Sequence, residues 1–357
     1  MPSAMAPFDV VATYNRLLTE DPDLTMPVAA IESLVIALSQ HPSTTVSETL
    51  TLLTTLTSQL KAGVSNPIAL SAGTDLFQRY IITTLQRPAA ASGRSGSEVA
   101  SFEDVRSHLV RNGRLFVERA KEARERIAAF GRGFVRDGSV VLTNGGSRVV
   151  GALLRSAAEG SRGFGKGGSV RFKVIYVVNS QGAVGEGKGK ATPGLVGDEE
   201  SRANISALRK LGVPVAVIPA TAMAYCLGQV TACFVGAEGV VENGGIISRL
   251  GTYQMGMLAK QAGKPFYVVA ESHKFVRLYP LGQHDLGIEQ NIVDFRTDDG
   301  DVGEAAGAKT SGIATLPPKN LDEAVDFTPP HLISGIITES GVLLPSAVSE
   351  ELIKIWF

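Results

Sequence analysis

The stretch SVVLTNGGSRVVGALLRSAAE, residues 139–159, decides the fold class. It begins as an apolar run, passes through a glycine pair and continues as a helical segment. Five further apolar runs follow it, with helical stretches between several of them, at 171–178, 213–219, 231–237, 265–270 and 333–338. Continuous apolar strands separated by helices are typical of a parallel sheet covered on both faces. We therefore predict an α/β domain with a mainly parallel sheet over residues 131–357.

The preceding 130 residues are predicted to form a helical domain, 1–130. One helix buries a stripe at spacings i, i+3, i+4 and i+7, made of Ile31, Leu34, Val35 and Leu38. Another begins at Thr45, where Thr45 and Glu48 form a candidate capping box. Small residues between 87 and 98 are interpreted as a linker before the longest helix. In that helix the charge run ERAKEARER, 118–126, is interpreted as the solvated face.

Composition excludes several classes of protein. The net charge of −1 argues against a general nucleic-acid-binding protein, which needs a basic surface. Cys226 and Cys233 form no CxxC pair, so we interpret them as buried apolar residues in a reducing compartment. The five histidines have no ligand-like spacing, so no metal site is expected. No run is long and apolar enough for a membrane span and no signal peptide is evident, so we expect a cytoplasmic protein without membrane contact.

Polar side chains gather where the predicted strands end. In a parallel sheet these ends meet at one edge, where ligands bind. The candidate ligand-binding residues are Thr143, Asn144, Gly145, Ser147 and Arg148 after the first strand, Asn179 and Ser180 after the second, and Glu238, Asn243 and Arg249 after the fourth. Guanidinium groups and backbone N–H groups suit a phosphate, and a carboxylate suits sugar hydroxyls. The set therefore suits a phosphorylated sugar or a nucleotide.

The spacing of these residues leaves a simpler alternative open. The NGG sequence has neither the dinucleotide-binding nor the P-loop spacing, so it supports neither a classical dinucleotide site nor NTP hydrolysis. The glycines could simply form tight turns, while Glu238 pairs with an arginine for structural reasons.

Two long segments carry a resemblance to a known family. They are VGAEGVVENGGIISRLGTYQMGMLAKQAGKPFYVVAESHKFVRLYP (235–280) and DFTPPHLISGIITESGVLLPSAVSEELIKIWF (326–357). Both resemble the regulatory subunits of translation initiation factor 2B, the alpha, beta and delta family, and its alpha members above all. Matching stretches upstream include LVRNGRLFVERA and SAGTDLFQRYI. The resemblance covers most of the chain apart from 87–98, 182–200 and 295–320, of which the last two read as long surface loops.

The resemblance implies a helical N-terminal domain followed by a Rossmann-like domain. It also implies a regulatory, non-catalytic subunit of the guanine-nucleotide exchange complex that recharges initiation factor 2 with GTP. Its expected partners are a second copy of itself and the beta, delta, gamma and epsilon subunits of initiation factor 2B. A further expected partner is the alpha subunit of initiation factor 2, especially when phosphorylated.

The same superfamily contains enzymes, methylthioribose-1-phosphate isomerase and ribose-1,5-bisphosphate isomerase. The resemblance implies that those enzymes carry a cysteine at the position of Gly145 and an aspartate at that of Glu238. Their Asn–Lys pair corresponds to Ser248 and Arg249. Isomerisation needs acid or base groups at both reacting carbons, and glycine supplies none, so we expect no catalytic residues and no required cofactor.

We expect the cleft to hold a sugar phosphate or a nucleoside monophosphate without turnover. Arg249 and the 143–148 loop would contact the phosphate, and Glu238 and Asn243 the sugar. The alternatives are an active isomerase and a structural subunit with an empty pocket. Whether 182–200 covers the pocket stays open.

The chain ends in a cluster of large apolar residues, Val342, Leu343, Leu344, Ile353, Trp356 and Phe357. These residues dock either on the chain's own core or at a subunit interface, since chain ends fray unless docked.

Overall fold

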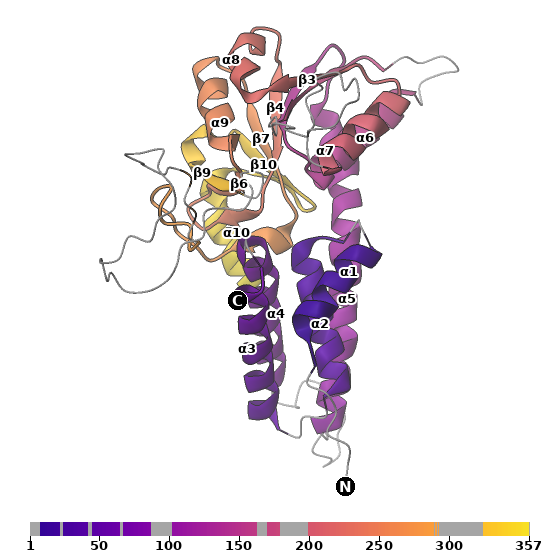
Figure 1. The fold of residues 1–357 in the computed structure, drawn as a ribbon, viewed down its shortest axis with the longest axis vertical. Coiled ribbons are helices and arrows are strands. Elements are labelled where there is room, and N and C mark those ends of the chain that lie inside the picture. The colour runs from indigo at the N-terminus through magenta and orange to yellow at the C-terminus, as the bar shows by residue number, and fades with distance from the viewer. Residues whose placement is uncertain are drawn as a thin grey trace, which may run out of the picture.

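The computed structural model describes residues 8–21, 24–41, 45–64, 67–86, 102–162, 170–178, 199–288, 290, 292 and 324–356. Its first part is a set of helices: α1 (Val10–Glu20), α2 (Met26–Gln40), α3 (Val46–Ala62), α4 (Pro67–Gln86) and α5 (Phe102–Gly131). These helices lie below the sheet in Figure 1, and α5 extends upward beside it. None of the helices in the described ranges is long and apolar enough to span a membrane.

Local sequence sets where these helices begin. The Asp9 side chain caps α1 by accepting from the Ala12 N–H at 2.9 Å, and Thr45 caps α3 by accepting from the Glu48 N–H at 3.2 Å. The predicted stripe on α2 is buried from Ile31 to Leu38, and α2 packs against all four other helices. It is therefore the centre of the helical core.

The main sheet has seven strands in the order β11-β10-β7-β4-β1-β2-β3. Their bounds are β1 (Val140–Asn144), β2 (Lys173–Val178), β3 (Val215–Pro219), β4 (Ala232–Gly236), β7 (Phe266–Val269), β10 (Gly335–Thr338) and β11 (Gly341–Leu343). All neighbours pair in parallel except β11, which runs antiparallel to β10. The predicted α/β class with a mainly parallel sheet is confirmed.

Helices cover both faces of this sheet. One core is shared with α5, α6 (Arg148–Arg162) and α7 (Glu199–Lys210), and the other with α8 (Met223–Cys226), α9 (Thr252–Gln261) and α10 (Val348–Trp356). Figure 1 shows α6 and α7 on one side of the strands and α8 and α9 on the other. Burial on both faces is the reason that the strands read as unbroken apolar runs.

A second sheet of four strands was not predicted. It has the order β8-β5-β6-β9, formed by β5 (Gly239–Val241), β6 (Ile246–Arg249), β8 (Phe275–Val276) and β9 (Val325–Thr328). β5 and β6 form a hairpin, and its turn contains the Asn243–Gly244 pair that favours tight hairpins. Ile68 and Ala72 of α4 pack on this sheet. The predicted division at residue 130 stays a prediction, because α5 packs on both α2 and α6.

Candidate functional site

The strand order places a topological switch point between β1 and β4. From β1 the chain continues to β2 and β3 on one side, then returns to β4 and continues to β7 and β10 on the other. In open α/β sheets ligands bind beyond the carboxyl ends of the strands at such a point. A cavity of about 90 Å³ lies there, between the 144–149 segment, Gly236–Glu238, Glu200 and Arg249. The helical part closes it with Thr25, Met26, Pro27 and Ala69.

The glycines after β1 form a tightly packed loop. Gly145 has a φ of +66°, which disfavours any residue with a Cβ, and a Cβ there would lie 3.0 Å from Cδ of Arg249. Gly146 packs against the backbone of Ser201 and the side chain of Glu200, with no room for a methyl group. A Cβ on Gly236 would collide with the Ser147 side chain. These contacts bring the loop, β4 and the start of α7 together at the cavity.

Two arginines meet on one carboxylate in this cavity. Nε and Nη2 of Arg148 donate to Oε1 of Glu200 at 2.9 and 2.6 Å, and Nη2 of Arg249 donates to Oε2 at 2.9 Å. Each of the three side chains is about one-third exposed. Nη1 of Arg148 also donates to the carbonyl of Leu24, between α1 and α2. The arginines expected to bind phosphate therefore already hold an anion.

Glu238 borders the cavity, in the connection from β4 to β5. Burial raises the pKa of its carboxyl, with Glu200 and Glu271 adding to the effect, while Lys274 and Arg148 oppose it. The buried hydroxyl of Tyr14, on α1, interacts with two of the same groups, Glu238 and Arg148. Burial and Glu238 raise the pKa of Tyr14 to about 12, and this hydroxyl has no hydrogen-bond partner within the described part of the chain. The first helix thus reaches the same electrostatic environment.

A buried ion cluster forms the wall beside Glu238. The carboxylate of Glu271 lies 3.3 Å from Nζ of Lys274 and 3.8 Å from Nε of Arg124, which comes from α5. Burial alone would raise the pKa of Glu271, but Lys274, His273 and Arg124 lower it to about 2. The prediction that the whole charge run 118–126 is solvated is thus wrong for Arg124. Nε2 of His273 also lies 3.4 Å from the Thr25 hydroxyl.

Five of the predicted site residues line this cavity: Asn144, Ser147, Arg148, Glu238 and Arg249. The side-chain amide of Asn144 has a structural role, because its Nδ2 donates to the hydroxyl of Thr252 at 3.1 Å and to the carbonyl of Leu250. Thr143 is fully buried outside the lining. Gly145 lies behind Arg249 and is not in the lining either. Asn179 and Ser180 lie outside the described residues.

The prediction that Asn243 contacts a sugar is corrected by its hydrogen bonds. Its Nδ2 donates to the carbonyl of Pro280 at 2.8 Å, and its Oδ1 accepts from the Gly245 N–H at 2.9 Å. Asn243 is not among the cavity-lining residues, because the β5–β6 hairpin carries it away from the mouth of the main sheet.

The predicted ligand-binding set lacked five polar residues of the lining: Thr25, Glu200, Ser248, Glu271 and Lys274. Glu200 falls at the end of the predicted loop 182–200, yet Glu199 and Glu200 form the first turn of α7. Acidic residues directly before an amphipathic stretch are a helix-start signal that could have indicated this. Thr25 belongs to the helical part, so no local pattern relates it to the sheet.

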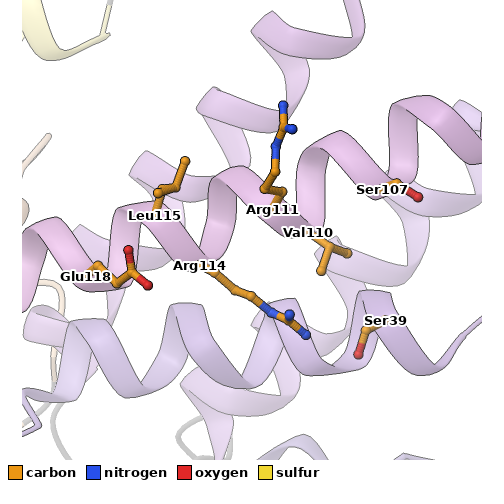
Figure 2. Close-up of a pocket in the computed structure, with 7 residues that line it drawn as sticks. All are labelled: Ser39, Ser107, Val110, Arg111, Arg114, Leu115 and Glu118. Carbon is orange, nitrogen blue, oxygen red and sulfur yellow. The ribbon is translucent and has the colours of Figure 1, made fainter.

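A larger hollow of about 510 Å³ lies between α2 and α5 (Figure 2). Ser39 of α2 faces Arg114 of α5 across it, and Arg111, Leu115 and Glu118 are also part of its lining. These α5 side chains are exposed at the helix surface. We favour the strand-end cavity over this larger hollow, because among the described residues charged groups of both signs converge at the strand-end cavity in partly or fully buried positions.

The sequence matches a known protein family and two of its members along most of its length. Residues 19–345 match the model of the initiation factor 2 subunit family. The chain is 32% identical to translation initiation factor eIF2B subunit alpha of Dictyostelium discoideum, over 97% of this chain and 96% of the relative. It is 29% identical to the corresponding subunit of Caenorhabditis elegans, over 97% and 98%.

Enzymes and a solved assembly also show similarity. Ribose 1,5-bisphosphate isomerase of Archaeoglobus fulgidus is 28% identical, over 69% of this chain and 66% of the enzyme. The crystal structure of the tetrameric eIF2B-beta2-delta2 complex from C. thermophilum contains a chain with the same fold. It aligns with a TM-score of 0.65 and 18% identity, over 97% of this chain and 95% of that one.

Proposed function

Because this chain belongs to the initiation factor 2 subunit family, we propose that it is the alpha-type regulatory subunit of the initiation factor 2B exchange complex. The observation that carries the proposal is similarity to alpha subunits along almost the whole of both chains. Its partners would be the beta, delta, gamma and epsilon subunits and the phosphorylated alpha subunit of initiation factor 2. The complex would act in the cytoplasm.

Reconstitution with and without this chain tests the role. The five co-expressed subunits should elute as one assembly, and nucleotide exchange on initiation factor 2 should fall when its alpha subunit is phosphorylated. Omitting this chain should make exchange less sensitive to that phosphorylation. An equal response with and without the chain would show that it has no regulatory role.

The geometry of the β1 loop argues against isomerase activity. Gly145 has no reacting group, and the Arg249 side chain fills the space that a side chain at 145 would need. We expect purified protein to leave ribose 1,5-bisphosphate and methylthioribose 1-phosphate unchanged in a coupled assay. Turnover that persists in a Glu238→Gln variant would point to a contaminant, whereas turnover lost in that variant would overturn the assignment.

A homodimer would bury the exposed apolar residues around the Asn243 turn. Asn243 bonds to Pro280 and Gly244 packs against Pro345, so Leu281 and Leu344 flank one turn. Leu281 is 83% exposed and Leu344 62%. The C-terminal helix itself docks inward through the buried Val348 and Leu352.

Charge substitution at this surface tests the dimer better than truncation, which would remove Leu352 from the core. Leu344→Glu should halve the solution mass measured by sedimentation. Tyr225→Glu, on α8 and 90% exposed, provides the matched control and should leave the mass unchanged. Equal masses for Leu344→Glu and the original protein would contradict this interface.

The cavity is proposed to hold a sugar phosphate or a nucleoside monophosphate, with no cofactor required. Arg148 and Arg249 supply guanidinium groups for a phosphate, and Glu238 borders the same space for hydroxyls. Calorimetric titration with ribose 5-phosphate should show binding that Arg249→Ala abolishes. Equal binding by both proteins, or binding by neither, would contradict the proposal.

A further inference from the structure

The side chain of Glu200 lies between the two guanidinium groups that a bound phosphate would need. Oε1 accepts both hydrogen bonds from Arg148, and Oε2 accepts from Arg249 at 2.9 Å. Guanidinium groups that bind a carboxylate in this way also bind phosphate, because both anions present oxygens that accept from the arginine N–H groups. The chain therefore supplies its own anion to this place.

The small volume of the cavity also indicates that Glu200 occupies space that a ligand would need. Small-molecule sites usually enclose roughly 300–1,000 Å³, whereas this cavity measures about 90 Å³. Glu200 belongs to its lining, so withdrawal of this side chain would both enlarge the space and release hydrogen-bond donors. Glu200 therefore occupies part of the space that a sugar phosphate would need.

Withdrawal of Glu200 requires movement of one side chain, not of helix α7. The helix start is fixed by the contact of Gly146 with the Ser201 backbone. Asn204, one turn later, donates to the Ser147 carbonyl at 3.1 Å and accepts from Arg155 at 3.0 Å. The Glu200 side chain is 33% exposed, which leaves it a path toward solvent.

Charged and ionisable groups of both signs line the cavity. Three cations, Arg148, Arg249 and Lys274, face three carboxylates, Glu200, Glu238 and Glu271. Glu271 is ion-paired with Lys274, and burial disfavours the charged form of Glu238. A phosphate added beside Glu200 would place like charges side by side and would have to share the two arginines with the carboxylate. A phosphate that replaces Glu200 meets the two arginines.

We propose that Glu200 is a built-in competitor for the phosphate subsite, held between Arg148 and Arg249 until a phosphorylated ligand displaces it. This inference rests on the proposed ligand-binding function of the cleft. Its consequence is a binding affinity that depends on the strength of an internal ion pair, because each ligand must displace Glu200 from the two arginines.

Calorimetric titration of the full chain with ribose 5-phosphate tests this competition. Glu200→Gln keeps the side-chain shape and removes the charge, so its affinity should rise about tenfold, the equivalent of ~1.4 kcal/mol. Glu199→Gln is the matched control, because it removes an exposed carboxylate from the same first turn of α7 and should not change affinity. Thermal melts confirm that each variant is folded, and Glu200→Asp, too short to reach both arginines, replaces Glu200→Gln if that variant does not fold.

Each result has a distinct meaning. Tighter binding by Glu200→Gln alone supports the competitor. Binding by the original protein that Glu200→Gln leaves equal or weakens overturns the competitor and keeps the ligand site. A similar gain in affinity for Glu199→Gln would mean that the effect comes from losing negative charge anywhere in the first turn of α7. This result also overturns the competitor. Binding by no protein overturns both this inference and the proposed ligand function.

Discussion

Gly145 meets two separate constraints at the edge of the cavity. Its φ of +66° is left-handed, and a Cβ there would lie 3.0 Å from Cδ of Arg249. Gly138 meets only the first, because its φ is +80° but nothing lies within 4 Å of a Cβ built on it. Comparing the same substitution at the two glycines therefore separates the cost of backbone strain from the cost of displacing Arg249.

We predict that Gly138→Ala lowers the free energy of unfolding by about 1 kcal/mol, the usual cost of a left-handed conformation for an L-residue. Gly145→Ala should cost about 2–3 kcal/mol, since Arg249 must also shift. Urea denaturation measures both. Equal losses would show that Arg249 adapts without cost.

His273 provides a pH-dependent prediction at the same scale. Burial lowers the pKa of His273 to about 4, with Lys274 and Arg124 adding to the effect and Glu271 opposing it. The unfolded state, with an ordinary pKa near 6.5, binds more protons between these values. The contribution of His273 to stability therefore falls by about 3 kcal/mol in total as the pH falls from about 6.5 to about 4. Burial raises the pKa of Asp326 to about 7, so Asp326 contributes in the opposite direction over the same range.

Urea denaturation of the original protein and of two variants at pH 7 and pH 5 isolates the His273 contribution. The difference in the free energy of unfolding between the original protein and His273→Gln should be smaller at pH 5 than at pH 7, because Asp326 titrates in both proteins and cancels. The same difference for His331→Gln, at an exposed position, should not change with pH. Glu271 does not interfere, because its lowered pKa of about 2 restricts its own loss of stability to pH values below about 4.5. A difference for His273→Gln that is the same at both pH values would contradict the lowered pKa of His273.

At the scale of elements, the sequence predicts the strands that helices cover on both faces and misses the strands of the small sheet. Six predicted strands correspond to β1, β2, β3, β4, β7 and β10, because strands covered by helices on both faces are continuous apolar runs. The small sheet has strands of two to four residues, and its β5 and β6 are joined by a hairpin rather than a helix, so they lack the alternation of strand and helix that marks the main sheet. The Asn243–Gly244 pair is a hairpin signal, although Asn243 was predicted from the sequence to be a ligand contact.

The candidate site divides in the same way. Topology alone brings β1 and β4 together, so Arg148, Glu238 and Arg249 could be predicted to converge. For Glu200 the helix-start signal indicates only where α7 begins, whereas its pairing with Arg148 and Arg249 depends on tertiary contacts. Tyr14 and Thr25 come from helices whose packing on the sheet depends on tertiary contacts alone.

The β5–β6 turn offers a prediction that separates structure from binding. Asn243→Ala removes the bonds to Pro280 and Gly245, which should lower the free energy of unfolding by about 1–2 kcal/mol. Affinity for ribose 5-phosphate should stay unchanged, because Asn243 lies outside the cavity. Denaturation and titration of one preparation measure both, and a loss of affinity in folded protein would restore Asn243 to the site.

At the scale of the whole molecule, the helical part and the sheet are joined as one unit. Helix α5 runs 30 residues and packs on α2 and α6, with Gly113 against Val35 and Gly131 against Leu153. Arg148 reaches the Leu24 carbonyl, and α4 covers the small sheet. The cavity lies where these contacts meet, so its shape depends on how the two parts are held together.

Arg124 tests this connection, because it extends from α5 to the buried Glu271 beside the cavity. Its side chain is 16% exposed, and Glu271 is 1% exposed. Arg124→Met keeps the apolar stem but removes one cation from a buried carboxylate. We expect a loss of about 2–4 kcal/mol in the free energy of unfolding, since breaking a buried ion pair leaves its charge poorly compensated.

Arg126→Met is the matched control on the same helix. Its pair with Glu122 is 61% and 57% exposed, so the change should cost less than about 0.5 kcal/mol. Hydrogen exchange would locate the effect of Arg124→Met, with faster exchange expected in α5 and around residues 271–276 at once. Faster exchange in α5 alone would mean that Lys274 suffices to hold Glu271, and that the two parts are joined by apolar packing rather than by this ion pair.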